Sequence, residues 1–158
     1  EIGITADLPG LAASGGVLSL AEGRYMLIEV PMHTLPYGIE HVVAGLKSIG
    51  KVPVLAHPER NRELQSKPKR ILSIVRAGAL VQVTASSLSG SFGREAKRCT
   101  LEFADLGALD FVSSDGHSPE RRRPLVSQGI DELEKSFGPE IVKKVTENSF
   151  RVIEDAPI

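Results

Sequence analysis

Residues 25–57 read YMLIEVPMHTLPYGIEHVVAGLKSIGKVPVLAH, and this stretch predicts the fold of the chain. It begins and ends with apolar runs of strand length, Tyr25–Val30 and Val52–His57. Both runs are continuous rather than alternating, which is typical of parallel strands covered on both faces. The segment between them, residues 38–50, carries apolar residues at helical spacing and stops at a glycine, a common helix end. The stretch therefore predicts a strand–helix–strand unit.

The same alternation extends in both directions along the chain. Further strands are expected at residues 1–5, 79–84 and 109–114, and helices at 68–78, 93–108, 125–138 and 139–153. The Gly- and Ser-rich segment Pro9–Arg24 is expected to be a loop with a weak strand or turn. This order predicts an α/β fold with about five parallel strands. Five strands form an open sheet or an incomplete barrel, because they are too few to close one.

Composition excludes several classes of protein. The chain has 158 residues, 41% hydrophobic and 25% charged, which is ordinary for one soluble domain. A net charge of -1 and the lack of aromatic–basic interleaving argue against nucleic acid as a partner. No apolar run approaches the ~20 residues of a membrane span, so we expect a cytoplasmic protein without membrane insertion. Asp105, not Arg, stands six residues after the single cysteine, Cys99, which excludes a Cys-x5-Arg phosphatase loop.

Polar residues gather where the expected strands end. Because the carboxyl ends of parallel strands face one shared mouth, these side chains are expected to lie together. Glu29 lies within an apolar run, where an unpaired carboxylate is unfavourable, so it needs either Arg60 or a metal ion as its partner. Carboxylates and imidazoles on separate strand ends are the ligands that Mn²⁺, Zn²⁺ and Fe take in proteins. The candidate metal ligands are Glu1, Glu29, His57, Asp115 and His117.

Each of these features also has a purely structural interpretation. Residues 115–118 could form a turn with an Asx-type hydrogen bond. Glu29 could be half of an ion pair, and His57 could precede the start of a helix. The run Arg121–Arg123, taken alone, is typical of a solvated turn. The sequence leaves these alternatives open for each feature by itself.

The joint pattern resembles a known family. Glu1, Glu29 and His57 are each 28 residues apart, one in each βα unit, and the last expected strand is followed by Asp115-x-His117. Together with GALVQVTASSLSGSFG at residues 78–93 and RRRP at 121–124, this order resembles the PHP (polymerase and histidinol phosphatase) superfamily. Within it, the chain looks like the metal-dependent bacterial protein-tyrosine phosphatases of capsule and exopolysaccharide operons. The resemblance covers essentially the whole chain.

The resemblance implies a fold, a cofactor and a substrate. The fold would be a PHP-type distorted (β/α)7 barrel, with residues 1–158 forming a single domain that is its C-terminal two-thirds. The cofactor would be divalent metal, manganese with zinc or iron as alternatives. The substrate would be a phosphotyrosine protein, a polysaccharide-export tyrosine kinase. By similarity, Glu1 would bridge two metals, Glu29 and His57 would complete one of those sites, Asp115 would ligate the other, His117 would belong to a third, and Arg60 and Arg122 would hold the phosphate.

The chain departs from the family at its beginning. The family starts with a His-x-His strand, followed by an Asp and another His that complete two of the metal sites, and none of these precedes Glu1 here. We therefore expect either the remainder of a complete enzyme or a truncated product, with weak or absent activity by itself. Exposed strand edges would also favour homo-oligomers. A histidinol-phosphatase-like enzyme for small molecules, a nuclease-like enzyme and a non-catalytic phosphate-binding or regulatory protein remain alternative functions.

Overall fold

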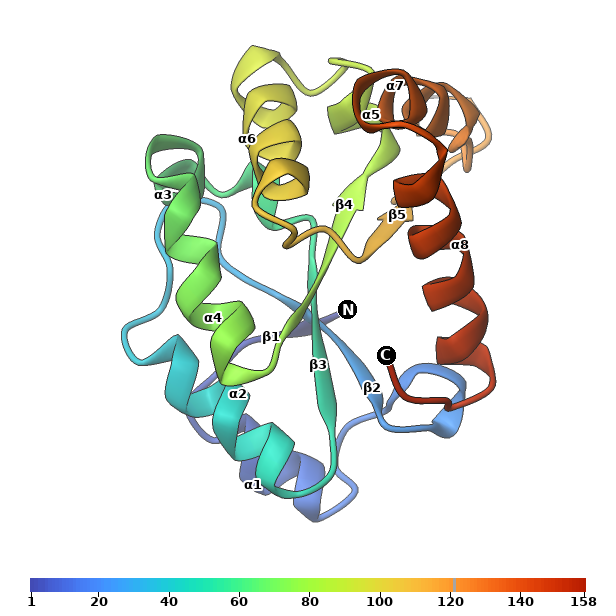
Figure 1. Cartoon of the computed structure of the whole chain (residues 1–158). Coiled ribbons are helices and arrows are strands. Elements are labelled where there is room, and N and C mark those ends of the chain that lie inside the picture. Colours follow the sequence, from blue (N-terminus) through green and yellow to red (C-terminus); the bar gives the residue numbers. More distant parts are fainter. Residues whose placement is uncertain (121) are drawn as a thin grey trace.

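The computed structural model describes residues 1–120 and 122–158 (Figure 1). Its strands form a single sheet in the order β1-β2-β3-β4-β5, and every neighbouring pair is parallel. This confirms the predicted α/β fold with about five parallel strands. The strands are β1 (Ile2–Gly3), β2 (Tyr25–Glu29), β3 (Val52–Ala56), β4 (Leu80–Thr84) and β5 (Phe111–Ser113).

Helices follow the strands as the alternation predicts. In Figure 1, α1, α2 and α4 lie on one side of the sheet, while α8 lies on the other side, near β5. The last predicted helix matches α8 at both ends, whereas α3 and α5 are too short to leave a periodic pattern in the sequence. The helices are α1 (Leu8–Ala13), α2 (Ile39–Ser48), α3 (Arg62–Ser66), α4 (Ile71–Ala77), α5 (Ala85–Leu88), α6 (Arg94–Asp105), α7 (Ser127–Phe137) and α8 (Pro139–Ile153), and the 3-10 turns are η1 (Leu20–Glu22), η2 (Pro58–Arg60) and η3 (Pro68–Arg70).

The main apolar core lies between the sheet and its covering helices. Ile28, Leu55 and Val81 of the central strands are fully buried in it. The predicted apolar stripe of α2 is buried along its length, and Cys99 of α6 is also a core residue. A second, smaller cluster of Tyr25, Val54 and Phe111 covers the opposite face of the sheet. Burial on both faces explains why the strands read as continuous apolar runs.

The expectation of a loop over Pro9–Arg24 is wrong in part. Residues 8–13 form α1, with Pro9 in the first turn, where a missing N–H is tolerated. Leu8 and Ala12, one helical turn apart, are buried, and α1 packs on α2. Tertiary packing thus overrides the low helix propensity of a short segment with Pro and Gly.

Two further features bear on the sequence-based expectations. No helix within residues 1–120 and 122–158 is long and apolar enough to cross a bilayer. Arg121, the first residue of the expected arginine run, lies outside the described residues.

Candidate metal centre

Glu29 and His57 lie side by side at the carboxyl ends of two neighbouring strands. Glu29 is the last residue of β2 and pairs in register with Ala56, and His57 follows directly. The His57 backbone N–H donates to the carbonyl of Gln82, so the chain stays paired to β4 at this point. His57 then turns away from the sheet in the left-handed region, at φ 36°, immediately before Pro58. Strained backbone at a non-glycine residue is concentrated at functional sites in proteins.

The side chains around His57 form a compact group. His57 Nε2 lies 3.4 Å from Glu1 Oε2 and 3.6 Å from Glu29 Oε1. One ligand atom each from Glu1, His57 and Asp115 lies within 4.8 Å of the others. Glu1 precedes β1, His57 follows the central strand β3 and Asp115 follows β5, and His57 is almost fully buried. The convergence at the carboxyl edge of the sheet is the arrangement that the sequence predicts.

Asp115 is buried and holds two arginines. Its Oδ2 accepts a hydrogen bond from Arg60 Nη1 at 2.8 Å and another from Arg122 Nη2, while only 4% of its side chain is exposed. Arg60 is therefore the partner of Asp115 and not of Glu29, which corrects one of the two partners proposed from the sequence. The neighbour of Glu29 is the imidazole of His57.

His117 lies at the edge of this group. Its Nδ1 is 3.4 Å from Asp115 Oδ1, but 57% of its side chain is exposed. The segment is not extended, because Asp115 has φ 50° and the Gly116 N–H donates to the hydroxyl of Ser114. The backbone bends here, but the hydrogen bond involves Ser114 and not the Asx side chain proposed for residues 115–118. Asp115 and His117 nevertheless point to the same side.

A buried carboxylate anchors the turn that carries His57 and Arg60. Glu59 is fully buried and accepts hydrogen bonds from the Thr84 N–H at 3.0 Å and the Ser87 hydroxyl at 2.6 Å. Burial raises the pKa of Glu59, so its neutral form is favoured relative to an exposed glutamate. Glu59 is not among the site residues predicted from the sequence. Its place within the polar segment HPERN gave no sign that η2 folds into the interior.

The donor set fits a divalent cation. Carboxylates of Glu1, Glu29 and Asp115 surround a single imidazole, and of these three only Asp115 has arginine partners within the described residues. Like charges at this spacing are unfavourable unless a cation is present between them. Oxygen and imidazole ligands suit Mn²⁺, Zn²⁺ and Fe. The residues of this centre could therefore hold such an ion.

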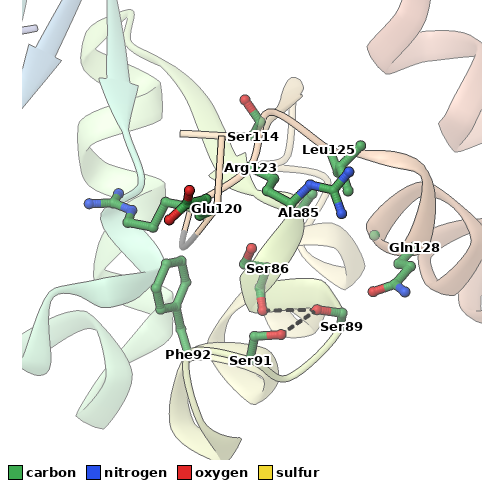
Figure 2. A pocket seen from close by; sticks show the side chains of 12 residues that line it. Ala85, Ser86, Ser89, Ser91, Phe92, Ser114, Glu120, Arg123, Leu125 and Gln128 are labelled. Atoms are coloured by element: carbon green, nitrogen blue, oxygen red, sulfur yellow. Dashed lines mark hydrogen bonds between the residues drawn. The ribbon is translucent and has the colours of Figure 1, made fainter. Parts of the chain in front are cut away.

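A pocket of about 320 Å³ adjoins the arginines. In Figure 2, Ser91 and Phe92 lie on one side of it and Arg123 and Leu125 on the other. Arg122 lines the pocket as well as contacting Asp115, so the pocket and the centre are continuous. Phe92 belongs to the stretch on which the family resemblance rests, yet no pattern in the sequence predicted a role for it.

Comparison with known proteins identifies the family. The family model for capsular polysaccharide synthesis, CpsB/CapC, matches residues 1–154. Tyrosine-protein phosphatase YwqE of Bacillus subtilis (strain 168) is 36% identical over 149 residues, which are 94% of this chain and 59% of YwqE. The putative tyrosine-protein phosphatase CapC of Staphylococcus aureus is 34% identical over 128 residues, which are 81% of this chain and 50% of CapC.

A solved structure gives the same result. It comes from work on YwqE of Bacillus subtilis and CpsB of Streptococcus pneumoniae, described there as unique metal-dependent tyrosine phosphatases. The match has a TM-score of 0.95 at 35% identity and covers 100% of this chain but 64% of the other. The chain thus spans about three fifths of the length of YwqE. It belongs to the CpsB/CapC family of capsular polysaccharide synthesis.

Proposed function

We propose that this chain supplies most of the active site of a metal-dependent phosphomonoester hydrolase, a protein-tyrosine phosphatase that regulates capsule or exopolysaccharide synthesis. One observation carries the proposal. Ligand atoms of Glu1, His57 and Asp115 converge within 4.8 Å of one another, and two guanidinium groups contact the same Asp115. A metal-ligand cluster beside a pair of arginines is an arrangement suited to phosphate ester hydrolysis.

The metal ligands in this proposal lie around His57 at the carboxyl ends of the strands, and Glu1 reaches this group from the start of β1. A divalent ion, manganese with zinc or iron as alternatives, would supply Lewis-acid stabilisation of the charge that develops on phosphoryl oxygens. His57 is held for this role by its backbone bond to Gln82 and by the buried Glu59 anchor. The proposed ligands are Glu1, Glu29, His57, Asp115 and His117.

Arg60 and Arg122 are proposed to bind the phosphate. Guanidinium groups bind phosphate oxygens through paired, charge-assisted hydrogen bonds. Nε of Arg122 is buried and has no hydrogen-bond partner among the residues that the structure describes. A buried donor without a partner is rare in proteins and is expected to have a reason. A bound phosphate oxygen would satisfy this donor.

The surroundings of the centre favour a protein substrate over a small metabolite. The pocket beside Arg122 has an exposed apolar rim, in which 54% of Leu125 is accessible. Such a rim can contact the residues that flank a phosphotyrosine. We propose that the substrate is the phosphotyrosine of a polysaccharide-export kinase in the cytoplasm. The names of the relatives, which are tyrosine-protein phosphatases, support this choice.

Hydrolysis of a phosphotyrosine peptide and of p-nitrophenyl phosphate, with and without Mn²⁺, tests the proposal. The assay compares this chain with a longer one. The longer chain also carries the part of the relatives' length that the match does not cover. We expect Mn²⁺-dependent hydrolysis by the longer chain and weak or absent hydrolysis by residues 1–158. His57→Ala should abolish it, while His41→Ala, which removes an exposed histidine of α2, should not.

The outcomes separate the competing functions. Preference for a small phosphorylated metabolite over the peptide would favour a histidinol-phosphatase-like enzyme. A folded longer chain that binds phosphate but hydrolyses neither substrate with Mn²⁺ would show a phosphate-binding protein instead. Full turnover by residues 1–158 would contradict the expected need for further residues.

A further inference from the structure

One aromatic side chain lies against both proposed phosphate-binding arginines. The guanidinium carbon of Arg60 is 4.7 Å from the centre of the Phe92 ring, and that of Arg122 is 5.9 Å from it. Both distances lie within the range of cation–π attraction. The two arginines come from segments far apart in the sequence, the η2 turn and the loop after β5. Phe92 and Asp115 are thus two shared contacts of the pair.

The loop that carries Phe92 is closely fixed. It connects α5 to α6, and the backbone N–H groups of Ser91 and Phe92 both donate to the carbonyl of Ser86. Gly90 and Gly93 flank the two residues with φ of 88° and 92°, a region that side chains disfavour. About a third of the Phe92 residue is exposed, so its ring is not required to fill the core. A fixed loop with a half-exposed aromatic ring suggests a role at the surface that it faces.

Metal binding should affect the two shared contacts, Asp115 and Phe92, differently. Asp115 is a proposed metal ligand, and an oxygen that coordinates a cation is a poorer acceptor for two guanidinium groups. Asp115 then attracts the two guanidinium groups less strongly, while they still repel each other and the cation. The face of Phe92 is unaffected by metal binding. Its ring therefore stays within cation–π range of both guanidinium groups.

We propose that Phe92 is a positioning residue, which holds Arg60 and Arg122 together as a phosphate-binding pair once Asp115 is engaged by metal. This inference rests on the proposed function of the site. Phe92 touches neither metal nor phosphate in this role, and it acts through the two guanidinium groups. Two cation–π contacts at a partly exposed site correspond to roughly a 5- to 30-fold change in affinity.

Binding of inorganic phosphate to the longer chain loaded with Mn²⁺, measured by calorimetry, tests the role without relying on turnover. Phe92→Leu keeps an apolar side chain but removes the aromatic face, and it should weaken phosphate binding by the factor above with Mn²⁺ content unchanged. Phe92→Tyr should restore the affinity. Phe150→Leu is the matched control, because Phe150 is an exposed aromatic residue of α8 that takes part in no described arginine–ring contact.

A spectroscopic measurement makes the test independent of phosphate binding. The Nε–H proton signals of Arg60 and Arg122 should show ring-current shifts that vanish in Phe92→Leu and persist in Phe150→Leu. Unshifted arginine signals, or equal phosphate affinity of the wild type and a folded Phe92→Leu, would overturn the proposal. If the wild type takes up no Mn²⁺ or binds no phosphate, the proposed function fails, and the ring-current signals still decide whether Phe92 holds the arginines.

Discussion

Two polar clusters of this protein both contain carboxylates and arginines but differ in charge balance. Between α2 and α4, Glu40 accepts hydrogen bonds from Arg70 and from the Ser73 hydroxyl. The Arg70 hydrogen bond lowers the pKa of Glu40 to about 2, although partial burial opposes it. This cluster has one carboxylate, one guanidinium and one hydroxyl. It is complete without any further ion.

The cluster at the carboxyl edge of the sheet is not balanced in this way. The carboxylates of Glu1 and Glu29 both lie next to the imidazole of His57. Neither has an arginine or lysine partner among the described residues. Asp115, next to them, takes both arginines. Charged residues alone therefore do not indicate a cation site. What indicates one is a group of carboxylates that outnumbers the cationic side chains beside it.

Exchanging one carboxylate for an amide should affect the two clusters differently. The largest expected effect is on Mn²⁺ affinity at the edge of the sheet. Glu29→Gln should raise the dissociation constant for Mn²⁺ by roughly 10- to 100-fold, the range that loss of an important metal contact produces. Metal-free stability should be unchanged or slightly higher, because a surplus negative charge is removed. Calorimetric titration with Mn²⁺ measures the first effect and thermal unfolding in chelator the second. Glu40→Gln, as the control, should bind Mn²⁺ like the wild type.

Removing an arginine from the edge cluster separates phosphate binding from metal binding. Arg122→Ala should weaken phosphate binding by about 10-fold or more, because a charge-assisted contact is lost, while the Mn²⁺ content stays the same. Arg76→Ala, at an exposed position near the end of α4, is the control. Elemental analysis together with phosphate titration measures both quantities. An Arg122→Ala chain that unfolds would instead show that Arg122 mainly neutralises the buried Asp115.

The sequence predicted the strands and the approach of Glu29 and Asp115 to His57 because both follow from the order of the strands. Continuous apolar runs set the strands, and the ends of parallel strands must lie at one edge. It did not predict the partner of Arg60, because both Glu29 and Asp115 lie at that edge and only tertiary placement decides between them.

The burial of Glu59 and the role of Phe92 were missed for a related reason. Both residues lie in turns, where no periodic pattern shows which side chain faces the interior. The short α1 was missed because its stability comes from packing on α2 and not from the helix propensity of its sequence.

The smallest predicted effect concerns the balanced cluster at acid pH. The pKa of Glu40 is about 2 in the folded chain against 4.5 without its partners, so ionised Glu40 stabilises the fold. That contribution is fully present above pH 4.5 and is lost as the pH falls through 2. Because about a third of the Arg70 side chain is exposed, the contribution should not exceed about 1 kcal/mol.

Urea unfolding should therefore show Glu40→Gln less stable than the wild type at pH 6, with the difference vanishing near pH 2. Glu147→Gln on α8, whose exposed carboxylate lies 4.0 Å from Lys143, should show no such dependence. A difference between Glu40→Gln and the wild type that persisted to pH 2 would mean that the amide disturbs packing and not charge, and the balanced cluster would then no longer be a valid counterpart of the metal centre.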